Sequence, residues 1–227
     1  MKKVTDRHEP DKEKYIHTEG IDYSKTGKDS IWGPGDKDTL ELLKKIDIHG
    51  TWLNLAAGDG RYNVNLLKEA DFVVASDLDE SALSKLWHNT PLKYRTKLTL
   101  TGFDLTKRFP FKDESFEGLF CTSTLHYFSE KVLHKIFLEI DRILKKRGRI
   151  IVEFATDMKR VLPDGNTYIR ESEPLYEFEE AVSFLKRLLE NYEVHIIESE
   201  VLPEHVKTER FEYTLSCKLI IITADKK

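Results

Sequence analysis

Short apolar segments alternate with amphipathic segments along this chain, and that alternation constrains its fold more than any other feature. The apolar segments are rich in β-branched and bulky residues, as buried strands are; they lie at 51–56, 72–76, 98–103, 116–121 and 149–154. Helical periodicity separates them, most clearly over 130–145. The alternation predicts an α/β fold in which a parallel sheet has helices on both faces.

The end of the chain follows a different pattern. A helix is expected at about 174–190, and two strands then follow at 194–199 and 213–223 with no helical signal between them. Parallel neighbours need a crossover connection, so this last pair is predicted to form an antiparallel hairpin. The sheet then has seven strands.

We expect one main domain, residues 36–227, with insertions at 155–173 and 200–212. Residues 1–35 are polar and end in the breaker cluster Trp32-Gly33-Pro34-Gly35. This segment is interpreted as a flexible N-terminal arm or lid.

Composition restricts the class of protein. The chain is 40% hydrophobic and 33% charged, with a net charge of −4, which argues against a general nucleic-acid-binding surface. Neither a membrane span nor a secretory signal is expected, and Cys121 and Cys217 lie in apolar segments typical of buried thiols in a reducing compartment. We therefore expect a cytoplasmic protein. The histidines show no metal-ligand spacing, so no metal is expected.

Glycines and acidic residues mark the ends of the predicted strands. Gly58 and Gly60 let backbone amides approach a ligand at a helix N-terminus. Asp77 follows 19 residues after Gly58, close to the spacing at which a carboxylate meets ribose hydroxyls, and Asp104 is placed to accept from an adenine amine. Because Arg61 stands where a dinucleotide fingerprint has its last glycine, the pattern indicates an adenosine ligand other than NAD.

Five motifs in order resemble the class I (Rossmann-like) S-adenosylmethionine-dependent methyltransferases over about residues 38–223. They are LNLAAGDG, VVASDLD, GFD, FPFKDESFEGLFCTSTLHYF and LKKRGRIIVEF. The resemblance implies a three-layer fold with the sheet order 3-2-1-4-5-7-6, strand 7 being antiparallel. It also implies S-adenosyl-L-methionine as cofactor and S-adenosyl-L-homocysteine as product.

Carried over by position, the resemblance implies a cofactor site. The backbone of 56–60 would surround the methionine moiety, Asp77 would hold the ribose, and Leu78 would pack on adenine. The loop from Thr122 to His126 would flank the methyl donor. The full set of expected cofactor-binding residues is Asn54, Ala56, Ala57, Gly58, Gly60, Asp77, Leu78, Asp104, Leu105, Thr122 and Ser123.

Two of these residues depart from the family pattern. Asn54 replaces the usual acidic residue, and an amide can still accept a hydrogen bond. Ala56 replaces the first glycine, and its methyl group is tolerated if its φ is negative.

Methyl transfer from a sulfonium is an in-line displacement, so the enzyme has mainly to align donor and acceptor. A general base is needed only when the acceptor loses a proton, and His126 is the candidate for that role. Aromatic and histidine side chains are expected to line the acceptor pocket; they are Tyr15, His17, Tyr23, Trp32 and Tyr127.

Three absences point to a small-molecule acceptor. The loop after the fourth predicted strand lacks an Asp/Asn-Pro-Pro-Tyr stretch, and Cys121 follows phenylalanine rather than proline. An appended RNA-binding domain is not expected. Nucleic-acid and membrane partners are not expected. Two alternatives stay open: an RNA or protein methyltransferase that uses the arm and insertions for recognition, and a non-catalytic S-adenosylmethionine-binding regulatory protein.

Overall fold

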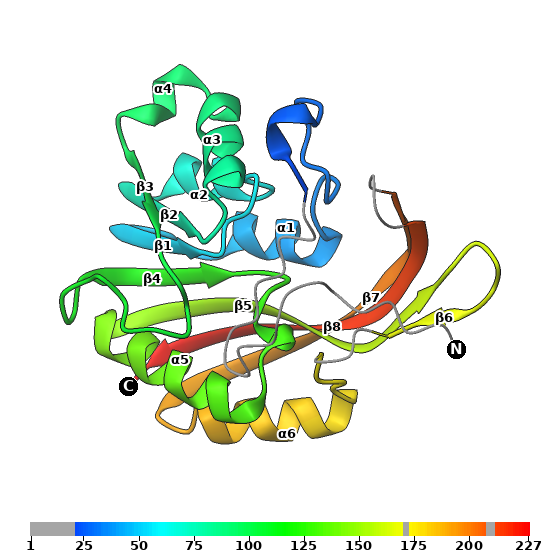
Figure 1. Ribbon diagram of the computed structural model, residues 1–227. Helices are drawn as coiled ribbons and strands as arrows, with labels where there is room; N and C mark the ends of the chain where they lie inside the picture. Colours follow the sequence, from blue (N-terminus) through cyan, green and yellow to red (C-terminus); the bar gives the residue numbers. More distant parts are fainter. Residues whose placement is uncertain (1–20, 170–172, 208–211) are drawn as a thin grey trace.

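A computed structural model describes residues 21–169, 173–207 and 212–227 of the protein. It contains an eight-stranded sheet with the order β3-β2-β1-β4-β5-β8-β7, and β6 pairs with β5 beside this path (Figure 1). The strands are β1 (Thr51–Leu55), β2 (Phe72–Asp77), β3 (Leu98–Gly102), β4 (Phe116–Cys121), β5 (Leu144–Val161), β6 (Thr167–Tyr168), β7 (Tyr192–Lys207) and β8 (Glu212–Lys226).

Helices cover both faces of the sheet, as the alternation predicts. Figure 1 shows α5 and α6 on one face and α1, α2 and α3 on the other. The helices are α1 (Lys37–Lys45), α2 (Asn63–Glu69), α3 (Glu80–Asn89), α4 (Leu92–Arg95), α5 (Glu130–Ile143) and α6 (Phe178–Leu188), with short 3₁₀ turns at η1 (Tyr23–Lys25) and η2 (Leu125–Tyr127). The result is a three-layer α/β arrangement.

The predicted strand order is confirmed. In the expected numbering β7 is the sixth strand and β8 the seventh, because the two-residue strand β6 was not anticipated. Strand β8 pairs antiparallel with both β5 and β7, while β1 to β5 pair in parallel. The terminal antiparallel hairpin, which was predicted because no crossover helix separates the last two strands, is therefore present.

Strands β5, β7 and β8 are longer than the sequence pattern predicted. We expected an irregular segment at 155–173, but β5 continues to Val161. The parallel partner β4 ends at Cys121, opposite Val152, whereas antiparallel pairing with β8 continues from Ala155↔Leu219 to Val161↔Thr214. The long antiparallel partner supplies the hydrogen bonds that keep 155–161 extended. At the right of Figure 1 these strands run well beyond the parallel part of the sheet.

Buried apolar side chains form a cluster on each face of the sheet. One cluster joins α5 and α6 to the sheet through residues such as Ile136 and Phe184. The other joins α1, α2 and α3 through Leu43, Leu66 and Leu86. A third, smaller cluster lies on β5 and β8, beside the pocket described below.

Within the described ranges, the structure contains no helix that is both long and apolar enough to cross a membrane.

Candidate functional site

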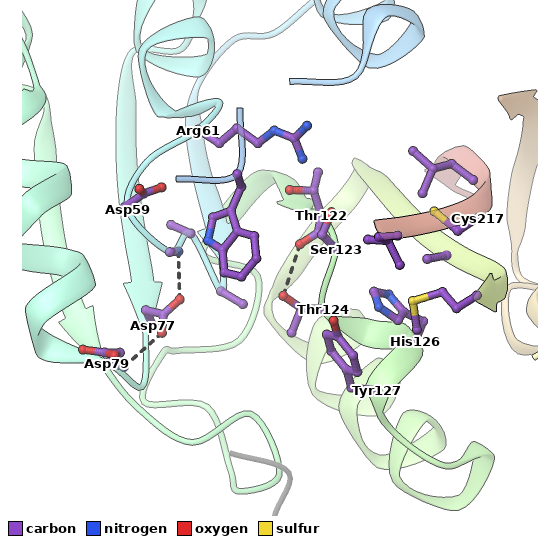
Figure 2. Close-up of a pocket in the computed structure, with 18 of the residues that line it drawn as sticks. Asp59, Arg61, Asp77, Asp79, Thr122, Ser123, Thr124, His126, Tyr127 and Cys217 are labelled. Carbon is purple, nitrogen blue, oxygen red and sulfur yellow. Dashed lines mark hydrogen bonds between the residues drawn. The ribbon is translucent and has the colours of Figure 1, made fainter. Parts of the chain in front are cut away.

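A cavity of about 260 Å³ opens at the carboxyl ends of β1 to β4 and extends toward β5 and β8. Most of the predicted site residues line it: Tyr23, Trp32, Ala56, Ala57, Gly58, Asp77, Leu78, Asp104, Leu105, Thr122, Ser123, His126 and Tyr127. Figure 2 shows Asp77 on one side and Cys217 on the other, with the loop carrying Thr122 between them. Tyr15 and His17 lie outside the described residues.

The glycine turn between β1 and α2 uses its two glycines differently. Gly58 has φ +54°, and a Cβ built there would meet nothing within 4 Å, so its backbone faces open space. Gly60 has φ +92°, and a Cβ there would lie 2.8 Å from Cγ of Leu86. Gly60 therefore permits close packing of α3, and it does not line the cavity.

The two departures from the family pattern have different structural consequences. Ala56 has φ +53°, so the condition that its φ be negative is not met and its β-carbon is held in the left-handed region. Asn54 is buried, and its Nδ2 donates to Oδ1 of Asn63 at 3.2 Å, away from the cavity lining. Asn54 joins β1 to α2 in this structure.

Asp77 ends β2 and binds the glycine turn. Its Oδ2 accepts from the amide of Gly58 at 2.8 Å, and its Oδ1 accepts from the amide of Asp79 at 3.0 Å. Burial raises the pKa of the Asp77 carboxyl, and the two amide hydrogen bonds oppose that rise. The next residue, Leu78, is 43% exposed although it is apolar, and it lines the cavity.

Asp104 follows β3 at the same edge of the sheet. Its Oδ1 accepts from the amide and the hydroxyl of Thr106, at 2.9 and 2.7 Å. Phe103 and Leu105 line the cavity beside it. Asp77, Leu78 and Asp104 thus share one end of the cavity.

A buried ion pair ties the described part of the N-terminal segment to the glycine turn. Nζ of Lys85 lies 2.9 Å from Oδ2 of Asp59, and their side chains are only 7% and 0% exposed. Asp59 also accepts from the hydroxyl of Ser30 at 2.7 Å and from the amide of Ile31 at 3.0 Å, while Lys85 donates to the hydroxyl of Thr26 at 2.9 Å. Residues 26–31 are therefore fixed beside the cavity.

Tyr23 and Trp32, on either side of that anchored stretch, both line the cavity. Nε1 of Trp32 donates to the hydroxyl of Tyr23 at 3.3 Å. Burial raises the pKa of Tyr23, so its hydroxyl stays protonated.

The loop after β4 holds the candidate base. Ser123 has φ +53°, and His126 in η2 is only 2% exposed although it lines the cavity. The His126 ring lies 4.1 Å from the Tyr127 ring, centre to centre, with an angle of 45° between the planes. Figure 2 shows His126 and Tyr127 together on the side of Cys217.

Sequence reasoning missed the wall formed by β5, β7 and β8. Leu215, Cys217 and Leu219 line the cavity, so Cys217 is not the fully buried thiol we expected. Burial raises its pKa to about 11. The spacing of two residues from 215 to 219 could have shown that these side chains share one face of a strand. No local signal placed that face at the pocket.

Glu153, in the middle of β5, was also missed. It is fully buried, and its Oε1 accepts from the hydroxyl of Tyr62 at 2.7 Å. Its Oε2 lies 3.4 Å from the hydroxyl of Ser123, which donates to it. Burial raises the pKa of Glu153. The sequence signal that could have identified Glu153 is that it is a single acidic residue within an apolar strand.

Fold and site together point to one class of protein. The strand order, the glycine turn and the two strand-end acids are those of a Rossmann-like methyltransferase. Residues 53–152 match the family described as "Methyltransferase domain". These residues make up less than half of the chain, which in its fold and in this matched part is similar to the class I S-adenosylmethionine-dependent methyltransferases.

Solved structures share this fold at low sequence identity. A structure of DhpI in complex with SAH is 18% identical, with a TM-score of 0.59, covering 82% of this chain and 81% of DhpI. YcgJ from Bacillus subtilis is 14% identical, with a TM-score of 0.63 and coverages of 85% and 99%. An S-adenosylmethionine-dependent methyltransferase from Mesorhizobium loti is 14% identical, with a TM-score of 0.60 and coverages of 86% and 100%. No curated protein matches the chain in sequence.

Proposed function

We propose that this protein transfers a methyl group from S-adenosylmethionine to a small-molecule acceptor. The observation that carries the proposal is one continuous cavity. It runs from Asp77 and Asp104 at one end, past the Thr122–Ser123 loop, to apolar side chains of β5 and β8 at the other. Such a cavity offers a nucleoside site and a second site on the two sides of one loop.

The residues at the acidic end fit the cofactor. Asp77 would hold the ribose, Leu78 would pack on adenine, and Asp104 with the Leu105 amide would read the adenine edge. The exposed apolar surface of Leu78 is what a purine ring would cover. The open space beside Gly58 lets the backbone of the turn approach the methionine moiety.

The bound cofactor would supply an electrophilic methyl group on a sulfonium. The protein would then align the acceptor with that group, exclude water, and hold any proton that the acceptor releases. His126 is the proposed base for such a proton, since its ring is buried at the cavity wall beside Tyr127.

The N-terminal segment 1–35 is proposed to act as a lid on this site. Tyr23 and Trp32 reach the cavity, and Asp59 of the glycine turn binds residues 30 and 31. A lid that covers the opening favours an acceptor small enough to be enclosed.

Calorimetric titration with S-adenosylmethionine and S-adenosylhomocysteine tests the cofactor assignment. Asp77→Ala is expected to weaken binding of both by about 1–3 kcal/mol, because hydrogen bonds to the ribose are lost. Asp71→Ala is the matched control, because Asp71 also accepts from a glycine amide, that of Gly50 at 2.9 Å, but outside the cavity. Equal affinities of a folded Asp77→Ala variant and the native protein would contradict the assignment.

The acceptor side is tested by release of S-adenosylhomocysteine with a panel of small nucleophiles. Turnover of any of them supports the proposal. Tight cofactor binding with no turnover of small molecules, but with methylation of RNA or protein, would replace it.

A further inference from the structure

The acceptor side of the cavity is apolar. We call it the acceptor chamber and define it by seven of the lining side chains of β5, β7 and β8: Ala155, Met158, Arg160, Val201, Leu215, Cys217 and Leu219. Five of these side chains belong to the third apolar cluster, namely Ala155, Met158, Val201, Cys217 and Leu219. The sheet register explains this, because Ala155 lies opposite Leu219 and Val201 lies opposite Cys217.

The one buried charge of the chamber is already neutralised. Nη1 and Nη2 of Arg160 each lie 2.7 Å from an oxygen of Glu173, which is a bidentate pair. The two side chains are 3% and 0% exposed, so the pair has no net charge to offer a ligand. Glu204, on β7, also lines the cavity, but it is exposed and its charge remains hydrated.

Arg160 nevertheless keeps one donor without a partner. Its Nε is buried and makes no hydrogen bond with any of the residues that the structure describes. A buried donor left unpaired is costly, and an oxygen atom of a ligand in the chamber would satisfy it. The chamber thus combines apolar walls with few hydrogen-bonding positions, namely this donor and the nearby side chain of Tyr213, which also lines the cavity.

We propose that the methyl acceptor is a neutral, mainly apolar molecule with one oxygen that accepts a hydrogen bond from Nε of Arg160. This inference rests on the proposed function and names the substrate class of the same site. A carboxylate or an ammonium group would lose its hydration in the chamber without gaining an opposite charge, since Glu173 already neutralises Arg160.

A series of four naphthalenes with the same ring tests the proposal: acetylnaphthalene, ethylnaphthalene, naphthoate and naphthylmethylamine. Each is titrated into the full-length protein with and without saturating S-adenosylhomocysteine. Acetylnaphthalene is expected to bind tightest. Ethylnaphthalene should bind about 3- to 10-fold more weakly because it lacks the oxygen, and both charged compounds more than 10-fold more weakly.

Cys217 reports whether each compound occupies the chamber. The chain has two cysteines, and burial of the other, Cys121, raises its pKa, so N-ethylmaleimide should label Cys217 alone. Acetylnaphthalene is expected to slow this labelling, and Cys217→Ser is the blank. Binding without protection of Cys217 would place the compound elsewhere and overturn the proposal.

The double variant Arg160→Gln/Glu173→Gln tests the hydrogen bond. It removes both charges of the pair together, whereas either single change would leave the other charge buried. The variant should bind acetylnaphthalene and ethylnaphthalene equally, with the affinity for ethylnaphthalene unchanged.

Equal binding of these two by the native protein would refute the role of Arg160, and preferred binding of naphthoate or naphthylmethylamine would refute the substrate class. If S-adenosylhomocysteine itself does not bind, the proposed function fails, and the series without it still tests the chamber.

Discussion

Replacing Ala56 by glycine should stabilise this protein, although the change shortens a side chain beside a cavity. Ala56 directly follows β1 and has φ +53°, in the region that a β-carbon makes unfavourable. The left-handed conformation costs such a residue roughly 1–2 kcal/mol. Glycine loses about 0.5–1 kcal/mol through the greater freedom of the unfolded chain. The difference predicts a net gain of about 0.5–1 kcal/mol for Ala56→Gly.

Urea unfolding of Ala56→Gly measures this gain, and the melting temperature should rise by roughly 1–4 °C for a chain of this length. Ala57→Gly is the matched control, because the neighbouring alanine is not among the residues with positive φ. It should lose about 0.5–1 kcal/mol. If Ala56→Gly is destabilised as much as Ala57→Gly, then the left-handed conformation of Ala56 carries no strain and the reasoning is wrong.

Three further perturbations test buried charge in the site. Lys85→Met leaves the Asp59 carboxylate buried without its cation, and should cost about 3–5 kcal/mol in urea unfolding. Tyr62→Phe removes the hydroxyl that donates to buried Glu153, and should cost about 1–3 kcal/mol in the same assay. The raised pKa of Asp77 means that its carboxylate takes up a proton at a higher pH than an ordinary aspartate. Since an ionised carboxylate accepts hydrogen bonds from ribose best, affinity for S-adenosylhomocysteine should fall as the pH is lowered, and the fall should begin at a higher pH than that at which ordinary aspartates titrate.

The two substitutions each have a control on the same chain. Lys45→Met removes an exposed partner of Glu41 at 3.9 Å, and should leave stability nearly unchanged. Tyr94→Phe removes the hydroxyl of a tyrosine that is only half-buried. A loss in either control as large as in its test variant would show that burial is not the cause. Affinity that stays constant down to the pKa of ordinary aspartates would refute the shift at Asp77.

The order of the elements could be predicted because burial leaves a local mark on sequence. Strand β5 is apolar over 150–152 because both of its faces are covered, and α5 repeats its apolar residues every three or four positions because one face is covered. The antiparallel hairpin could be predicted because no crossover helix separates the last two strands. Asp77 and Asp104 could be placed at one edge because parallel strands end on the same side.

The geometry of individual residues could not be predicted in this way. Whether Ala56 has a negative or a positive φ depends on the turn that fits between β1 and α2. The φ is positive, whereas the sequence analysis required a negative φ for alanine to be tolerated there. Asn54 stands at the position where the family has an acidic residue, but its side-chain amide donates a hydrogen bond to Asn63 on α2.

By itself the sequence determined the fold class and the acidic end of the pocket, because these depend on short periods and on residues next to strand ends. The strand order came from the resemblance of its motifs to a known family. Only the tertiary structure decided the other end of the pocket. Ala155 meets Leu219, and Asp59 meets Lys85, across long stretches of chain. Such contacts depend on strand register and on how one layer packs on another, and neither can be predicted from a short segment of the sequence.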